Sequence, residues 1–437
     1  MDAEYGDSVK ITTKDRVYEG ILMPRPEILD ENFIVLKLDN GYNIGIEKKK
    51  IQKIEVSKKY QKKKEIKQKL KRRKELPTVP VISFGGTISS RVDYKTGGVY
   101  ADYTAEDFVE MMPELQDIAN IKAEKAMSIM SEDINPEDWS AMARRIALDL
   151  NEKEVTGVVA THGTDTLHFS TAAMSFFLRN LSKPVIFTAA QRSIDRGSSD
   201  AFMNLQCAVN AAAKFDGAEV MTCLHGSTND DYCILNRGNR VRKMHTSRRD
   251  AFRPINELPL AKITQDGNIE ILNNNYKRKK FSEGKLFSQV TVDDVFEPKT
   301  GLVYVYPGMN PEILDFYLEK RYKGIVIAAT ALGHVATVNP KYSLMGKIEK
   351  LIENGIAVVI SSQTIYGRTH PYVYTNLRKL SMQLKCIFAE DILPETAYVK
   401  LGWVLGHTHK LDEARKMMLT NYAGEITERS DVNSFLY

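Results

Sequence analysis

The sequence of 437 residues predicts an α/β protein that is preceded by a small β-domain. The first 57 residues contain five short apolar runs, several of which alternate apolar with polar residues. From Val79 onward, apolar runs of strand length alternate with helix-like stretches, a pattern typical of a doubly wound, mostly parallel sheet. A further set of such runs after residue 300 indicates a second, smaller α/β unit.

The N-terminal β-domain is predicted to span residues 1–57. Its expected strands lie at residues 9–11, 17–22, 33–38, 42–46 and 51–56. The pair Asn40-Gly41 separates the third from the fourth, and Asn-Gly is a strong hairpin signal. Five short strands in so few residues favour a small barrel of the SH3-like or Sm-like kind.

A basic linker is predicted over residues 58–77. Between Lys58 and Lys74 there are eleven Lys or Arg residues and one Glu, a balance of +10, so the other 420 residues carry −5 within the total of +5. The run lacks Gly and Pro and is a charged helix or an extended linker, which Leu76-Pro77 then ends. Because the rest of the chain is mildly acidic, a uniform nucleic-acid-binding face is not indicated.

The remainder is divided into two α/β domains at 78–285 and 301–437, with a connector at 286–300. Expected strands of the first lie at residues 79–84, 155–160, 185–187 and 220–224, and a helix is expected over 167–181. Expected strands of the second lie at 302–306, 324–329 and 356–361. The stretch 272–299 is polar and basic, and we expect it to be irregular.

Composition and missing motifs exclude several classes of protein. No apolar stretch reaches the ~18 residues of a membrane span, and the N-terminus has neither a basic nor an apolar leader region. The four cysteines are scattered, which favours reduced thiols and a cytoplasmic location. The sequence contains no GxxxxGK[ST] loop, no HExxH and no paired-cysteine pattern, so we expect neither ATP use nor a metal centre in this chain.

Two short motifs about eighty residues apart carry the chemistry. They are FGGTI at residues 84–88 and THGTDT at residues 161–166, and each follows an expected buried strand. Each places a threonine hydroxyl on a glycine-containing turn at the carboxyl end of its strand, the edge at which open α/β sheets bind ligands. Two such hydroxyls, one with Asp165 beside it, favour acyl transfer with a threonine nucleophile. Taken singly, each motif would more often be a helix cap.

Both motifs resemble the signatures of the L-asparaginase/glutaminase family, and a third match is RGNRVRK at residues 237–243, the segment that holds the catalytic lysine of that family. The resemblance runs from Val79 to the C-terminus. It implies an asparaginase-like core of two α/β domains with mostly parallel sheets, preceded here by the N-terminal barrel.

The resemblance also implies the site residues. The catalytic ones are Thr87, Thr164, Asp165, Lys243 and Tyr100, the substrate-binding ones are Ser131, Glu132, Asp165 and Gly86, and no metal is involved. Thr87 is favoured as the nucleophile on family grounds, but the order in which the two threonines act stays open. Tyr100 is expected on a mobile lid, where Tyr94 and Tyr103 are competing assignments. A lysine that serves as base must be desolvated or lie beside other cations, and Arg240 and Arg242 are sequence neighbours that could contribute.

Three functions remain open from the sequence. The N-terminal extension and the sequence of residues 191–201 resemble the branch of the family that forms the D subunit of the archaeal glutamyl-tRNA(Gln) amidotransferase. That resemblance implies a cytoplasmic glutaminase without its own cofactor, forming a homodimer core in a heterotetramer with an E subunit that uses ATP and Mg to convert Glu-tRNA(Gln). The alternatives are a free-standing cytoplasmic L-asparaginase and an RNA-binding or scaffold protein on an inactive asparaginase fold.

Overall fold

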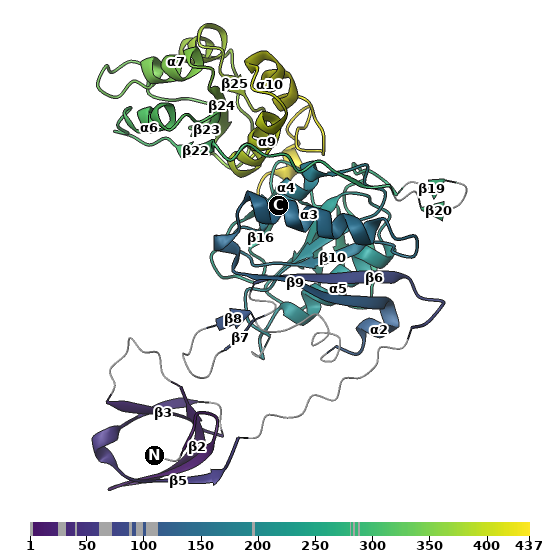
Figure 1. Ribbon diagram of the computed structural model, residues 1–437, viewed down its shortest axis with the longest axis vertical. Coiled ribbons are helices and arrows are strands. Elements are labelled where there is room, and N and C mark those ends of the chain that lie inside the picture. The colour runs from purple at the N-terminus through teal and green to yellow at the C-terminus, as the bar shows by residue number, and fades with distance from the viewer. Residues whose placement is uncertain are drawn as a thin grey trace.

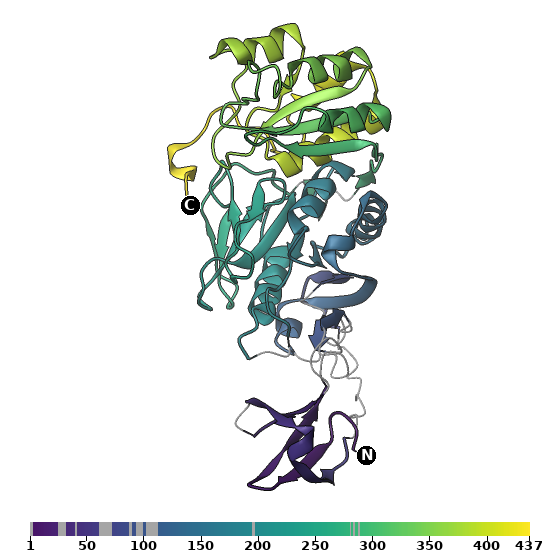
Figure 2. The same cartoon turned by 90° about the vertical axis from the view of Figure 1, so that its left-hand side faces the viewer.

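The computed structural model describes residues 3–24, 32–39, 42–60, 72–86, 90–92, 99–101, 112–194, 197–279, 281–282, 285–286 and 289–437, and every statement below concerns these. An N-terminal sheet, a larger α/β domain and a smaller α/β domain follow one another along the long axis of the molecule (Figures 1 and 2). Within the described residues, no helix has the length and apolar character that crossing a membrane requires.

The N-terminal unit is a five-stranded antiparallel sheet in the order β4-β3-β2-β1-β5. Its strands are β1 (Ser8–Thr13), β2 (Val17–Met23), β3 (Phe33–Lys37), β4 (Asn43–Glu47) and β5 (Ile51–Lys58). The first strand pairs with both the second and the last, so the sheet curls around a small apolar core, as Figure 1 shows. The five predicted strands are confirmed. The predicted turn at Asn40-Gly41 lies outside the described residues, although β3 and β4 form the expected antiparallel pair.

The larger domain is built on an eight-stranded sheet in the order β18-β17-β14-β13-β12-β10-β6-β9. The five strands from β13 to β9 run parallel, and the other three are antiparallel. In chain order the eight are β6 (Thr78–Gly85), β9 (Asn120–Ile129), β10 (Val158–Thr161), β12 (Val185–Thr188), β13 (Val220–His225), β14 (Cys233–Arg237), β17 (Ala261–Ile263) and β18 (Ile269–Ile271). The sheet is thus mostly parallel, as predicted.

Helices cover both faces of this sheet. The helices α3 (Pro136–Leu150) and α4 (Leu167–Phe177) pack on one face, and α2 (Leu115–Ile118) and α5 (Ala201–Lys214) pack on the other. The start of α3 is fixed locally, because Asn135 and Asp138 form a capping box and Pro136 occupies the first turn. Short pairs complete the domain: β7 (Ser90–Val92) with β8 (Val99–Ala101), and β15 (Val241–Lys243) with β16 (Phe252–Pro254).

The smaller domain has a four-stranded parallel sheet in the order β22-β23-β24-β25. Its strands are β22 (Thr300–Tyr304), β23 (Gly324–Ala329), β24 (Ala357–Ser362) and β25 (Ile387–Phe388). Its helices are α6 (Ile313–Glu319), α7 (Met345–Glu353), α8 (Thr375–Arg378), α9 (Pro394–His407) and α10 (Leu411–Met418). The three strands predicted for this unit are confirmed to within two residues at their ends.

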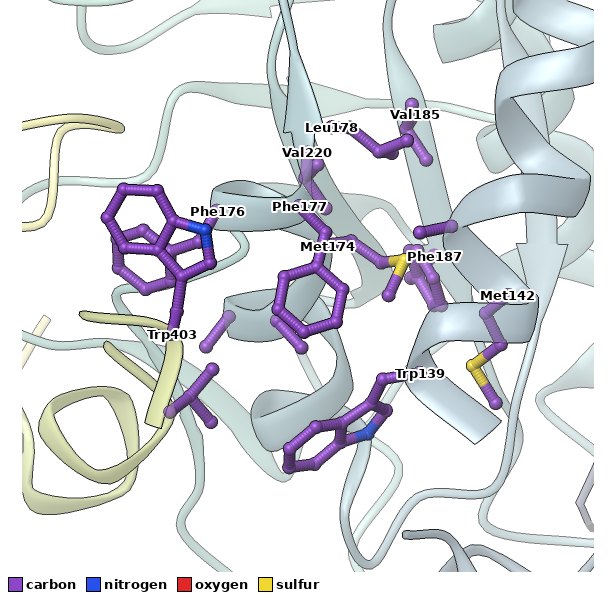
Figure 3. Packing of buried hydrophobic residues seen from close by; sticks show 14 of the residues in the cluster. Trp139, Met142, Met174, Phe176, Phe177, Leu178, Val185, Phe187, Val220 and Trp403 are labelled. Atoms are coloured by element: carbon purple, nitrogen blue, oxygen red, sulfur yellow. The ribbon is translucent and has the colours of Figure 1, made fainter. Parts of the chain in front are cut away.

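One apolar core joins the two α/β domains. Helix α4 of the larger domain packs against α9 of the smaller one, and the ring of Phe176 stacks on Trp403 with centroids 5.8 Å apart (Figure 3). Trp139, Phe177 and the ring of Phe296 extend this cluster. Because the core is shared, the two domains are fixed to one another by burial of large side chains.

Three details differ from the sequence expectation. The strand predicted over 155–160 begins at Val158, and Val155 forms only an isolated bridge with Thr78. The helix predicted over 167–181 ends at Phe177, because the chain leaves the helix to form β11 (Leu178–Arg179), which pairs with β21 (Thr291–Val292). The stretch 272–299, expected to be irregular, contains β19 (Phe281–Ser282), β20 (Lys285–Leu286) and β21. The residues 61–71 of the basic linker lie outside the described residues, and the domain boundaries stay a prediction.

Candidate active site

Three loops meet at the carboxyl ends of the parallel strands. They follow β6, β9 and β10 and contain Gly86, Ser131 and Gly163 respectively. A Cβ added to Gly86, which has φ +84°, would lie 2.2 Å from the backbone nitrogen of Gly163. A Cβ added to Gly163 would lie 2.6 Å from the hydroxyl of Ser131. Glycine is therefore required at both positions, because no larger residue allows the loops to approach this closely.

Lys243 connects to the motif of residues 161–166. Its ammonium Nζ lies 2.8 Å from Thr164 Oγ1 and 2.6 Å from Asp165 Oδ1. The side chain of Lys243 is 11% exposed, whereas that of Asp165 is 62% exposed. The lysine extends from the end of β15, which pairs with β16 through Lys243 and Phe252. The structure thus brings together three residues that lie up to 79 positions apart.

Ser131 supports the motif loop. Its hydroxyl accepts a hydrogen bond from the backbone N–H of Asp165 at 3.2 Å, and its carbonyl accepts one from Thr166 Oγ1 at 2.5 Å. Ser131 is buried, whereas the next residue, Glu132, is exposed. The structure therefore joins Ser131 to the motif loop and leaves Glu132 at the surface beside it.

Two of the predicted catalytic residues have side chains outside the described part of the chain. Thr87 directly follows Gly86 but is itself not among the described residues. Tyr100 lies in β8, where its backbone is paired with Arg91 of β7, and its side chain lies outside the described part. The assignments of Thr87 and Tyr100 stay predictions.

Two buried histidines flank the site. His162 is fully buried and donates from Nδ1 to the carbonyl oxygen of Gly163 at 2.7 Å. Burial lowers its pKa to about 4, because a charged ring would have to form without solvent. Burial also lowers the pKa of His168 to about 3, and the nearby cations Arg242 and Lys243 add to this effect. Both rings are therefore neutral near pH 7, and the hydrogen bond of His162 to Gly163 lies within the motif loop.

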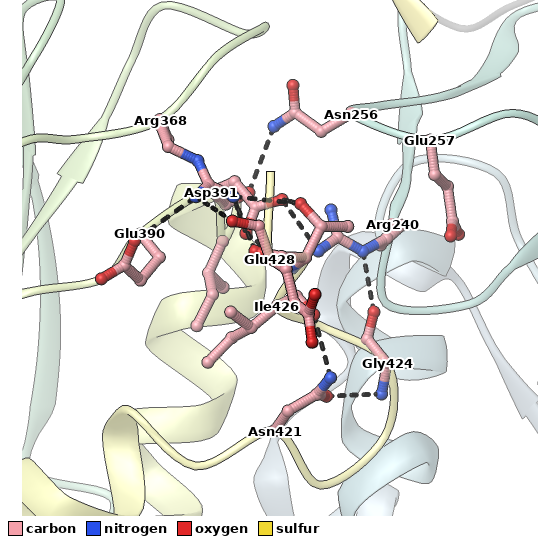
Figure 4. A network of polar contacts seen from close by, with 12 residues as sticks. Arg240, Asn256, Glu257, Arg368, Glu390, Asp391, Asn421, Gly424, Ile426 and Glu428 are labelled. Atoms are coloured by element: carbon pink, nitrogen blue, oxygen red, sulfur yellow. Dashed lines mark hydrogen bonds and ion pairs between the residues drawn. The ribbon is translucent and has the colours of Figure 1, made fainter. Parts of the chain in front are cut away.

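The smaller domain holds the segment that carries Lys243. Asn239 donates to the carbonyl of Ala423 at 2.9 Å. Arg240 donates to the carbonyl of Gly424 at 2.7 Å, as Figure 4 shows. Arg240 also pairs with the buried carboxylate of Asp391 at 3.0 Å. Two positions further on, Arg242 pairs with Glu395 at the start of α9, also at 3.0 Å.

These interdomain partners are functional residues that the sequence reasoning missed. Asp391 and Glu395 lie about 150 residues after the arginines they pair with, and no local pattern indicates the pairing. Thr166, by contrast, stands within the THGTDT motif, and its anchoring role could have been inferred from its hydroxyl.

The arrangement suits proton transfer at a hydroxyl. A lysine within hydrogen-bond distance of a threonine hydroxyl and a carboxylate can move a proton between the hydroxyl and a substrate. The exposed carboxylate of Asp165 is reachable by a charged substrate group. Among the described residues, no group of three or more His, Cys, Asp or Glu is placed to hold a metal ion.

Three family models match the chain. "Asparaginase, N-terminal" matches residues 78–277, "Glutaminase/Asparaginase C-terminal domain" matches residues 299–418, and "GatD N-terminal domain" matches residues 3–56. The three matches fall on the larger domain, the smaller domain and the N-terminal sheet respectively. The asparaginase-like two-domain fold expected from the motifs is therefore confirmed.

Two solved asparaginase structures are similar to this fold. The thermostable L-asparaginase from Thermococcus kodakarensis has a TM-score of 0.68 and 29% identity, and covers 80% of this chain and 99% of its own. L-asparaginase I from Vibrio cholerae has the same TM-score with 27% identity and the same coverage.

Curated relatives extend over the whole chain. The D subunit of the glutamyl-tRNA(Gln) amidotransferase of Pyrococcus furiosus is 51% identical over 436 residues, which cover 99% of this chain and 96% of the relative. The D subunit from Methanopyrus kandleri is 43% identical, with 96% and 91% covered. Since the similarity includes the N-terminal sheet as well as both asparaginase-like domains, the chain belongs to the family of glutamyl-tRNA(Gln) amidotransferase D subunits.

Proposed function

We propose that this chain is the glutaminase component of a tRNA-dependent amidotransferase. It releases ammonia from the side-chain amide of glutamine, and a partner, the E subunit, uses that ammonia to convert Glu-tRNA(Gln) to Gln-tRNA(Gln). The observation that carries the proposal is the contact of Lys243 Nζ with both Thr164 Oγ1 and Asp165 Oδ1. The names of the relatives support the coupling to tRNA.

The proposed roles follow from the chemistry of each group. Thr87 attacks the amide carbon, and the group of Thr164, Asp165 and Lys243 handles the protons. The carboxylate of Asp165 also pairs with the α-ammonium of glutamine, which its exposure allows. The backbone N–H of Thr164 donates to the oxyanion that forms during attack.

The reaction has two balanced steps. In the first, a C–O bond forms between the threonine oxygen and the amide carbon, the C–N bond breaks, and the hydroxyl proton passes to the departing nitrogen to give ammonia. In the second, water attacks the ester, the C–O bond to threonine breaks, and glutamate leaves as the hydroxyl is restored. Tyr100 would close over the bound substrate. Ser131, Glu132 and Gly86 would line the pocket that binds it.

The assembly is part of the proposal. The chain forms a homodimer core in a heterotetramer with the E subunit, in the cytoplasm where charged tRNA is made. The E subunit carries ATP and Mg, and this chain needs neither for amide hydrolysis. The N-terminal sheet favours this function over that of a free-standing asparaginase, because the amidotransferase relative covers 99% of the chain whereas the asparaginase structure covers 80%.

The test is ammonia release by the reconstituted complex of this chain with the E subunit. We expect Lys243→Ala to lower glutamine-dependent formation of Gln-tRNA(Gln) by about a hundredfold or more, since general acid–base groups contribute about that factor. Formation from added ammonium should persist, because the partner site is intact. The matched control is Lys341→Ala, an exposed lysine of the smaller domain, which should keep full activity.

Two results would contradict the proposal. One is full glutamine-dependent activity of Lys243→Ala. The other is rapid asparagine hydrolysis by the isolated chain with no stimulation by the E subunit or by tRNA, which would favour the free-standing asparaginase.

A further inference from the structure

A polar cavity of about 340 Å³ lies at the seam between the two α/β domains. Its lining includes Arg179 and Asn180 after α4, Val220 at the start of β13, and Tyr422 and Gly424 of the C-terminal segment. Val220 begins a strand of the parallel set, whereas the candidate active site lies at the carboxyl ends of that set. The cavity is therefore at the opposite edge of the sheet and is not part of the active site.

Arg179 is one of the cationic residues that line the cavity. Its guanidinium carbon lies 5.7 Å from the ring centroid of Trp403 and 5.4 Å from that of Tyr422, so two aromatic rings hold the group in place. Within the part of the chain that the structure describes, no carboxylate forms an ion pair with Arg179. A half-buried guanidinium is thus fixed by rings while its five N–H donors lack an anionic partner among the described residues.

The other charges of the cavity wall balance one another. Arg237 is 5% exposed and pairs with Glu219 at 2.5 Å and with Glu257 at 3.1 Å. The cavity is also lined by Lys277, whose backbone N–H donates to Glu219. The lining thus contains three cationic residues, which are Arg179, Arg237 and Lys277, and two carboxylates, which are Glu219 and Glu257. Its formal net charge is +1.

We propose that this seam cavity binds a small oxyanion, a phosphate or a carboxylate, through the Arg179 guanidinium. The planar fork of an arginine matches two oxygens of either group. The centroids of the Trp403 and Tyr422 rings lie only 5.0 Å apart, so both rings lie to one side of the guanidinium and do not enclose it. The cavity volume of about 340 Å³ is large enough for either group. The inference does not depend on the proposed glutaminase activity.

The experiment measures binding to the full chain at constant ionic strength. Inorganic phosphate and succinate, a carboxylate that is not the product of the proposed reaction, are titrated separately by calorimetry, with chloride as the reference anion. We expect saturable binding of at least one of them, and a loss of about tenfold or more in its affinity in Arg179→Met, because charge-assisted hydrogen bonds are removed. Arg429→Met, which changes an exposed arginine outside the cavity, should bind as the unmodified chain does.

A second measurement covers the case in which Arg179→Met does not fold. The unmodified chain is treated with phenylglyoxal, which modifies accessible arginines, and the sites are mapped by mass spectrometry. The bound anion should slow modification of Arg179 and leave that of Arg429 unchanged. Equal affinity in Arg179→Met, absence of saturable binding for both anions, or equal modification of Arg179 with and without anion would overturn the proposal.

Discussion

At the scale of single residues, the candidate site depends on contacts that neighbouring sequence does not indicate. The sequence suggested that Arg240 and Arg242 could act on the adjacent lysine through their charge. The structure instead turns both toward the smaller domain, where the carboxylates of Asp391 and Glu395 compensate them. Of these three cations, only Lys243 reaches the motif loop. The two arginines instead bind the segment to the smaller domain.

His162 makes the stability of the protein sensitive to acid. Its pKa in the folded protein is about 4, below the 6.5 of an exposed histidine, so the unfolded chain binds more protons between these pH values. We expect this residue to lower the free energy of unfolding by about 3 kcal/mol as the pH falls from 6.5 to 4. Chemical denaturation at several pH values measures this change in the free energy of unfolding.

The matched variant for this effect is His162→Asn, which keeps a donor for the carbonyl of Gly163 and does not titrate. Between pH 6.5 and 4, the free energy of unfolding of this variant should decline by about 3 kcal/mol less than that of the unmodified protein. An identical decline in both proteins would show that His162 is not the residue responsible.

At the scale of elements, β15, the strand that carries Lys243, is held by the smaller domain as well as by its own sheet. The pair β15–β16 is short, and β15 continues from a segment whose side chains and carbonyls bond to residues of the smaller domain between 391 and 424. Because Asp391 is fully buried and accepts from Arg240 and from the backbone of Thr427, it joins three segments at one point (Figure 4).

Replacing Asp391 should therefore be costly. Asp391→Ala leaves the guanidinium of Arg240, which is 2% exposed, without its charged partner, and breaking a buried pair in this way costs about 3 to 5 kcal/mol. Equilibrium denaturation measures this loss in the free energy of unfolding. The control is Glu413→Ala, which breaks an exposed pair with Lys410 and should cost at most about 1 kcal/mol. Equal losses in the two variants would contradict the importance of the buried pair.

At the scale of the whole molecule, the chain combines a unit with its own core and a two-domain body. The N-terminal sheet has an apolar cluster of its own, whereas the two α/β domains share one. Residues 73–76 are hydrogen-bonded to the two-domain body. The backbone N–H of Arg73 donates to the side chain of Asn120, and the side-chain amide of Asn120 donates to the carbonyl of Leu76.

Removal of residues 1–60 should accordingly leave the body folded. We expect the shortened chain to keep its thermal unfolding midpoint within a few degrees and to retain glutamine hydrolysis in complex with the E subunit. Formation of Gln-tRNA(Gln) should decrease more strongly, because the shortened chain keeps both asparaginase-like domains and the candidate active site. Parallel assays of ammonia and of Gln-tRNA(Gln) separate the two effects. A loss of both in equal proportion would contradict this division of roles.

The sequence by itself determined the elements and the reaction class. Strands β1 to β5 and β22 to β24 were recognisable because the alternation and length of apolar runs are local properties. Thr164, Asp165 and Lys243 were predicted as site residues because each stands in a short motif that resembles a signature of the L-asparaginase/glutaminase family. Only the tertiary structure decided that α4 stops at Phe177, where pairing with a strand more than a hundred residues away replaces the helix. The tertiary structure alone paired Arg240 with Asp391 and Arg242 with Glu395, and it alone placed Arg179 beside two rings. Such contacts form where distant segments pack, and they leave no trace in neighbouring residues.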